Sequence, residues 1–133
     1  MFLIAANVVA LGQVLSVKVT KDKFRVNNRI GFQIENSSKS VARYYVSVEA
    51  KIRDEWVEIV YELISHTPHY HRVHFDAIES GKIVARTAVL RRKDFQLLKK
   101  KEGSVECRIV ISYSISGGMP DQVSDSDPFT ILL

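Results

Sequence analysis

The side chains with the clearest chemical potential are the four histidines, which all fall within nine positions of the 133-residue chain. Imidazole is the commonest transition-metal ligand in proteins and the side chain whose charge changes nearest neutral pH. A cluster of this kind could bind a metal ion or respond to a mildly acidic pH. The segment reads HTPHYHRVH, and its histidines are His66, His69, His71 and His74.

Strand geometry reduces the four histidines to one pair. His69 and His71 are two positions apart, so on a β-strand both side chains point to the same face, where they could bind zinc or copper. The even-numbered histidines would point the other way, and a third ligand would require Pro68 or a bulge to break the register. Because spacing alone does not fix ligand geometry, the interpretation that the sequence favours is an exposed edge or loop with polar surface histidines.

No catalytic constellation accompanies the histidines. The chain has no G-x-S-x-G nucleophile elbow and no glycine-rich phosphate loop. The single cysteine, Cys107, alternates with apolar residues in a strand pattern, which predicts a buried and inert thiol. Asp76 and Glu79 lie close to the histidines as candidate oxygen ligands. We therefore expect a protein that is not an enzyme and has no cofactor other than zinc or copper at the histidine pair.

Two further motifs have simple interpretations. Asp121, Asp125 and Asp127 could supply oxygen atoms to calcium, but their spacing differs from that of an EF-hand and favours a solvated turn. Asn36, with two serines after it, fits the short acceptor signal for N-glycosylation.

The composition indicates one folded domain. Hydrophobic residues make up 46% of the chain and charged residues 26%, a balance and a length that allow a core without disulfide bonds. The net charge of +4 is small, because basic and acidic residues are interleaved. The densest basic runs, 91–93 and 99–101, lack an aromatic stacking motif, so we expect solvated surface and no nucleic-acid partner.

The first residues allow two interpretations. Residues 1–13 carry no charged side chain, and the apolar run 2–11 is shorter than the roughly twenty residues of a stable membrane span. Its length suits the apolar part of a secretory signal whose start lies upstream, although no lysine or arginine precedes Phe2. The other interpretation is a first β-strand of the fold. Residues 14–133 are predicted to form a single domain.

The elements that must position these residues are β-strands. Apolar and polar side chains alternate with period two, which indicates strands with one buried face. The alternation is clearest in 41–52, where Tyr44 and Val46 face one way and Tyr45 the other. The other predicted strands are 15–19, 30–34, 56–63, 82–90, 105–113 and 129–133, and a polar loop is predicted at 116–128.

These strands resemble bacterial immunoglobulin-like and fibronectin type III-like domains of surface and secreted proteins. FRVNNRIGFQIENSS, at 24–38, looks like their second strand and turn, while VECRIVISY, at 105–113, and DPFTILL, at 127–133, look like their last two strands. The resemblance implies a sandwich without catalytic residues. The chain has no cysteine pair between sheets, and Trp56 follows the long third strand instead of lying inside it, so the antibody-type subfamily is not implied.

The sequence thus predicts an all-β fold, an antiparallel immunoglobulin-like β-sandwich of about seven to eight strands, with one short helical turn near residues 93–101. We expect a non-catalytic interaction module, secreted, periplasmic or at the cell surface, that binds a protein or glycan through its loops or an edge near residues 66–75. Two alternatives stay open: a metal-binding domain that uses the histidine cluster 66–74, and an intracellular assembly subunit with residues 2–11 buried at an interface.

Overall fold

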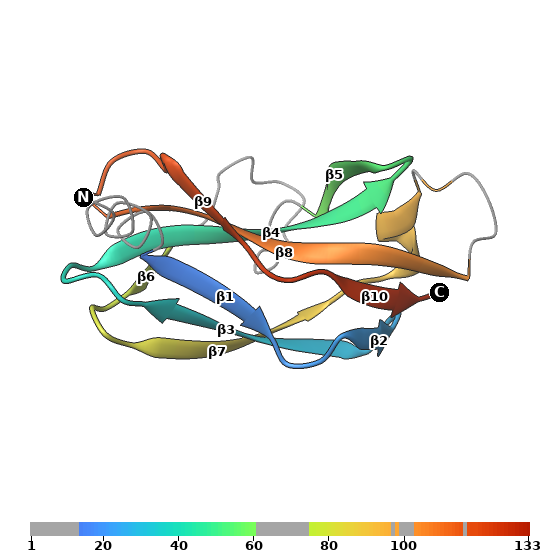
Figure 1. Cartoon of the computed structure of the whole chain (residues 1–133), viewed down its shortest axis with the longest axis horizontal. Helices are drawn as coiled ribbons and strands as arrows, with labels where there is room; N and C mark the ends of the chain where they lie inside the picture. Colours follow the sequence, from blue (N-terminus) through green and yellow to red (C-terminus); the bar gives the residue numbers. More distant parts are fainter. Residues whose placement is uncertain (1–13, 61–74, 97, 99–102, 116) are drawn as a thin grey trace, which may run out of the picture.

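The computed structural model describes residues 14–60, 75–96, 98, 103–115 and 117–133. In this part of the chain it contains ten β-strands and one 3-10 turn (Figure 1). The elements are β1 (Leu15–Val19), β2 (Lys23–Arg25), β3 (Arg29–Asn36), β4 (Ala42–Ile52), β5 (Glu55–Val60), β6 (Asp76–Ile78), β7 (Ile83–Val89), the 3-10 turn η1 (Arg92–Phe95), β8 (Ser104–Ser114), β9 (Gln122–Asp125) and β10 (Phe129–Leu132).

The smaller sheet consists of three antiparallel strands in the order β1-β3-β7. Its inner face is formed by the apolar half of each alternating strand. Leu15 on β1, together with Ile30, Phe32 and Ile34 on β3, is almost completely buried. The two strands and their buried apolar faces, as predicted for these segments, are therefore confirmed.

The larger sheet has the order β2-β10-β8-β4-β5, with β6 paired to β4 and β9 paired to β8. All its pairs are antiparallel except β2 with β10. The long strands β4 and β8 form its centre. A tight hairpin joins β4 to β5 through Arg53 and Asp54, which both have positive φ, at 54° and 64°. This backbone is that of the two-residue turns that match strand twist.

The two sheets form two layers with one hydrophobic core between them (Figure 1). The long strands β4 and β8 contribute alternate residues to this core, as their sequences predict. The largest fully buried side chains are Tyr44, Tyr113, Phe32, Phe129, Leu15, Ile30, Ile34, Ile78, Leu90, Ile109, Ile111 and Ile131. The fold is an all-β sandwich, so the predicted fold class is confirmed.

The structure differs from the sequence prediction in its short elements. β2, β6 and β9 were not expected, and β9 lies inside the region 116–128 predicted to be a polar loop. β9 has little apolar character, but it pairs with β8 beyond the point where β10 ends, and so satisfies main-chain groups along that edge. The helical turn occupies Arg92–Phe95 and so begins just before the predicted 93–101.

A serine makes the bend between β9 and β10. Ser126 is buried, its hydroxyl accepts a hydrogen bond from the Ile109 N–H at 2.9 Å, and its own N–H donates to the Ile109 carbonyl at 2.8 Å. The side chain therefore replaces one rung of the ladder while the chain bends. Among the described residues, no helix is long and apolar enough to span a membrane.

Candidate strand-addition edge

The predicted metal ligands lie outside the described residues, because His69 and His71 fall within 61–74. The two-histidine site therefore stays a prediction. Of the two nearby carboxylates, Asp76 accepts a hydrogen bond from Arg86 at 2.6 Å, so it serves an ion pair. Within the described ranges, no group of three or more histidine, cysteine, aspartate or glutamate side chains could hold a metal ion.

The outer strands of the smaller sheet, β1 and β7, each have one edge that no described strand pairs with. The hydrogen bond from the Asn36 N–H to the Lys82 carbonyl, 3.0 Å long, fixes which residues of β7 face β3. In the antiparallel register this places the even-numbered residues of β7 toward β3. The odd-numbered residues, Ile83, Ala85, Thr87 and Val89, therefore direct their N–H and C=O groups away from the sheet.

The same four residues also present their side chains on the outer face of the sheet, because both directions alternate with period two. All four side chains are exposed, with 59% of Ile83 and 38% of Val89 accessible. None of the four carries a charge or is proline. β7 is thus an edge seven residues long that lacks the lysines, prolines and bulges by which sheet edges usually avoid pairing.

The outer face beside β7 has a shallow hollow of about 430 Å³. Its floor includes Gly31 on β3, and Ala85 and Thr87 form its β7 side. Ala85 and Thr87 are short, so the surface stays low along β7, while the side chain of Thr20, just after β1, lies against Gly31. A long side chain from a strand placed beside β7 could lie across this hollow.

One charged residue of β7 points inward and is neutralised there. Arg86 donates hydrogen bonds to Asp76 on β6 at 2.6 Å and to the Tyr44 hydroxyl on β4 at 3.0 Å. Burial alone would lower the pKa of Arg86, but the bonds to Asp76 and Tyr44 outweigh it and raise that pKa. Arg86 therefore links the two sheets behind the open edge and leaves no free charge on the strand.

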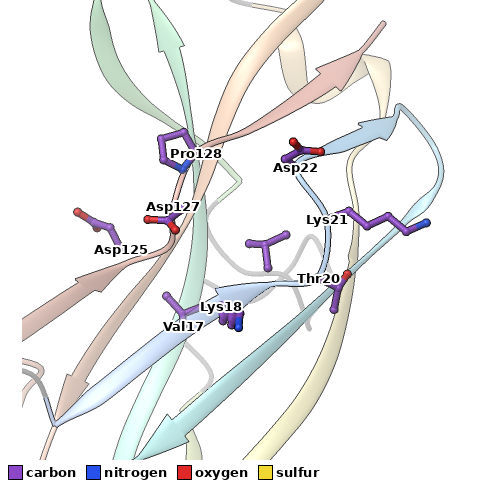
Figure 2. A pocket seen from close by; sticks show the side chains of 9 residues that line it. Val17, Lys18, Thr20, Lys21, Asp22, Asp125, Asp127 and Pro128 are labelled. Atoms are coloured by element: carbon purple, nitrogen blue, oxygen red, sulfur yellow. The ribbon is translucent and has the colours of Figure 1, made fainter.

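The edge of β1 has different surroundings. β1 lies against β8 and β9 of the larger sheet, and its exposed residues include Lys18. Where β1 and β9 diverge, a groove of about 340 Å³ lies between Val17–Asp22 and the segment Asp125–Pro128 (Figure 2). Figure 2 shows Asp22, Asp125 and Asp127 around this groove, while Lys21 extends away from it.

Two of the polar groups around this groove already have partners. Asp125 forms an ion pair with Arg108 at 3.4 Å, and the Asp22 carbonyl accepts a hydrogen bond from Thr130 at 2.8 Å. Asp121, Asp125 and Asp127, for which the sequence favoured a solvated turn over a calcium site, do not form a metal group among the described residues. All three side chains are exposed, as a solvated turn would have them, but Asp125 lies at the end of β9 and not in a turn.

The outer face of the larger sheet is occupied by contacts among its own side chains. Arg108 on β8 bonds Glu49 on β4 at 2.7 Å and stacks over Trp56 on β5, 4.3 Å from the ring centre. Tyr45 packs edge-on against Phe75, with 5.7 Å between ring centres. These aromatic side chains therefore pack within the domain and do not form an open aromatic platform.

Three predictions about single residues can be compared with the structure. Cys107 is fully buried, as predicted, and burial is the main cause that raises its pKa to about 12. Tyr44 belongs to the core and Tyr45 is only half-buried. The glycosylation interpretation of Asn36 is wrong for the folded domain, because the side chain is completely buried and its amide donates to the Ser40 and Ile78 carbonyls.

The edge of β7 was not among the sequence-predicted sites. The segment KIVARTAVL is apolar on both alternating faces apart from Lys82, Arg86 and Thr87, a pattern typical of a strand buried on both sides. Its position at the edge depends on the order of strands in the sheet, which local sequence does not contain. The available signal was the absence of any charge at positions 83, 85, 87 and 89.

No protein-family model and no curated protein matches the chain. Among solved structures it is similar to the chaperone–tip adhesion subunit pre-assembly complex CsuC–CsuE of archaic chaperone-usher Csu pili from Acinetobacter baumannii, with 13% identity and a TM-score of 0.48 over 83% of this chain. It is also similar to Spo0M, a sporulation control protein from Bacillus subtilis, with 15% identity and a TM-score of 0.44 over 90% of this chain. An alkylpurine DNA glycosylase from Pseudomonas fluorescens, AlkC, gives 13% identity and a TM-score of 0.39 over 94% of this chain.

This chain covers 47%, 49% and 32% of the lengths of those three solved chains, respectively. Similarity at this level of identity and TM-score assigns no function to the present chain. What the structure establishes is a β-sandwich with no match to a specific immunoglobulin-like or fibronectin type III-like family.

Proposed function

We propose that this chain is a non-catalytic interaction module that binds an extended segment of a protein partner by strand addition at the open edge of β7. The observation that carries the proposal is the edge itself: seven residues, no outward charge, and four residues whose main-chain groups point away from the sheet. An added strand gains affinity from main-chain hydrogen bonds, and its alternate side chains supply specificity.

The hollow on the outer face beside β7 would favour some partner side chains over others. Side chains of an added strand on that face would flank Ala85 and Thr87, which are too short to obstruct them. A long side chain could cross both residues and rest in the hollow between them and Thr20, whose side chain lies against Gly31. We therefore expect the bound segment to carry a long apolar or amphipathic side chain at one outward position.

The non-catalytic and exported parts of the proposal rest on other residues. The only cysteine is buried and has a raised pKa, which keeps its thiol protonated and covered. The apolar residues 2–11 support an exported or surface location. N-terminal sequencing of the protein from its native host tests the location, since removal of about a dozen residues would establish export.

Peptides selected from a displayed random library on the immobilised domain test the binding edge. Thr87→Pro removes an N–H that points away from the sheet and is not needed by the β3–β7 ladder, so the fold tolerates it. Thr87→Val keeps that N–H and nearly the same shape. We expect selected peptides to bind the wild type and Thr87→Val equally, and Thr87→Pro at least about tenfold more weakly.

A charge on the outer face provides a second pair of variants. Thr87→Lys places a lysine on the edge, whereas Ser16→Lys places the same charge on the outer face of β1 at the far side of the same sheet. Only Thr87→Lys should weaken peptide binding. Peptides that bind Thr87→Pro and Thr87→Lys as tightly as the wild type, or a library that yields no binder to the monomeric protein, would rule out strand addition at β7.

A further inference from the structure

We infer that the partner strand at the β7 edge is β7 of a second copy of this chain, paired antiparallel about a twofold axis at Arg86. This inference rests on the proposed function, since it uses the same edge and names the segment that occupies it. Two observations support it: the outward side chains of β7 are symmetric in size about Arg86, and Arg86 itself forms an ion pair with Asp76.

The outward-facing residues of β7 read nearly the same from both ends in side-chain size. Counting outward from Arg86, the next residues are Ala85 and Thr87, which are small, and the outermost are Ile83 and Val89, which are bulky and β-branched. An antiparallel pair centred on Arg86 places Ile83 opposite Val89 of the second copy and Ala85 opposite its Thr87. Aliphatic pairs of this kind across two strands stabilise a sheet.

The main-chain directions select this register as well. Only odd-numbered residues present N–H and C=O groups at the edge, so hydrogen-bonded pairs must join odd positions to odd positions. A twofold axis at Arg86 satisfies this condition for all four odd residues. Axes moved by one residue, to Ala85 or Thr87, would leave Val89 or Ile83 without a partner in the strand.

Charge also allows two copies to meet here. The outer side chains of β7 are neutral, and each Arg86 near the axis is bound to its own Asp76 at 2.6 Å. The two Arg86 side chains would lie opposite each other on the inner face, each held in an ion pair with its own Asp76 and not as a free guanidinium group. Away from this edge, the chain's net charge of +4 opposes nonspecific association.

A closed pair also accounts for an edge with no charge at its outward positions. A long, uncharged edge strand can add further chains without limit. When β7 pairs with β7 of a second copy, each covers the other, and no β7 edge remains to extend the assembly. Pairing through β7 would join the two smaller sheets into one sheet of six strands. That sheet would end at β1 of each copy, because β1 lies against β8 and β9.

Two measurements on the full chain test the pairing. Sedimentation velocity from micromolar to millimolar protein should show a reversible monomer–dimer equilibrium, which Thr87→Pro shifts to monomer and Thr87→Val leaves unchanged. In NMR spectra of methyl-labelled protein, an NOE should join Ile83 and Val89. Within one strand these residues are six positions, or about 20 Å, apart, so this NOE can only cross between copies.

The outcomes separate this inference from the proposed function. A protein that stays monomeric to millimolar concentration, yet binds selected peptides at β7, overturns the second copy as partner and leaves strand addition intact. A dimer that Thr87→Pro does not weaken, or that lacks the Ile83–Val89 NOE, overturns the pairing about Arg86. A monomer that also binds no selected peptide overturns both.

Discussion

The two outer strands of the smaller sheet differ in how well their free edges are protected against pairing with another strand. β1 carries Lys18 on its outer face and lies against β8 and β9, so its edge has little room for another strand. β7 carries no outward charge, and no described strand lies along its free edge. Because both edges belong to one small sheet, the difference indicates that strand pairing is prevented at one end and allowed at the other.

The strands differ in the same way at their inner faces. β1 contributes apolar side chains such as Leu15 to the core, whereas β7 places Arg86 at an inward position and ties it to Asp76 and Tyr44 on the larger sheet. β7 also packs the buried Ala88 into the core, so its inner face combines apolar packing with this polar link. This link keeps β7 in place without covering its outward side.

The largest expected effect comes from breaking that link. Arg86→Ala would leave the Asp76 carboxylate without its partner in a partly buried place, so we expect a loss of about 2 kcal/mol in the free energy of unfolding. Lys18→Ala, at the other edge, should change it by less than about 0.5 kcal/mol. Urea denaturation of both variants measures the difference. Equal losses would mean that Arg86 does not hold β7.

The sequence predicted the inward faces of the strands but not the difference between these edges. Alternation is a local property, so Leu15 and Ile30 were correctly assigned to buried faces. The order β1-β3-β7 depends on pairings between distant segments, and KIVARTAVL has the composition of a strand covered on both faces. The short strands β2, β6 and β9 escaped prediction because the neighbouring long strands, and not their own composition, hold them in the sheet.

The histidine segment illustrates another limit of local sequence. Spacing selected His69 and His71 as the same-face pair, but a metal site requires ligands from known positions in space, and this pair lies outside the described residues. The two-histidine site is therefore still a prediction from sequence. The strand-addition edge, by contrast, has only a weak signal in the sequence, its uncharged alternate positions, and its place at the edge follows from the sheet order.

Two neighbouring tyrosines in the core differ in whether their hydroxyl groups form a hydrogen bond. Tyr44 on β4 and Tyr113 on β8 lie opposite each other. The Tyr44 hydroxyl accepts a hydrogen bond from Arg86 of β7, while the buried Tyr113 hydroxyl has no hydrogen-bond partner among the residues that the structure describes. Tyr44→Phe should cost about 1 kcal/mol, whereas Tyr113→Phe should be neutral or stabilising, because it removes an unsatisfied buried hydroxyl. Thermal or urea unfolding checks both, and a larger cost for Tyr113→Phe would show that its hydroxyl is paired.

The smallest expected effect is at β5, the outer strand of the larger sheet, where charge protects the edge. Glu58 lies directly opposite Glu49, and burial, followed by the nearby Glu49, raises the pKa of Glu58. A folded-state pKa above the unfolded value means that stability falls as pH rises through it. Glu58→Gln should therefore stabilise the protein by about 0.5 kcal/mol at neutral pH.

The pH dependence provides the control for that variant. Below a pH of about 4, the glutamate is protonated in both folded and unfolded chains, so the advantage of Glu58→Gln should disappear. Urea denaturation at neutral and acidic pH measures both values. A gain that persists unchanged in acid would show that it does not come from the charge of Glu58.

Amide hydrogen exchange along β7, followed by NMR in dilute solution, tests the open edge most directly. The amides of Arg86 and Ala88 face β3 and should exchange slowly, whereas those of Ala85 and Thr87 point away from the sheet and should exchange at least about a hundredfold faster. This alternating pattern is what an open β7 edge requires. Equal protection of Ala85, Thr87, Arg86 and Ala88 in the monomer would show that the edge is already covered, and would contradict its role as a binding edge.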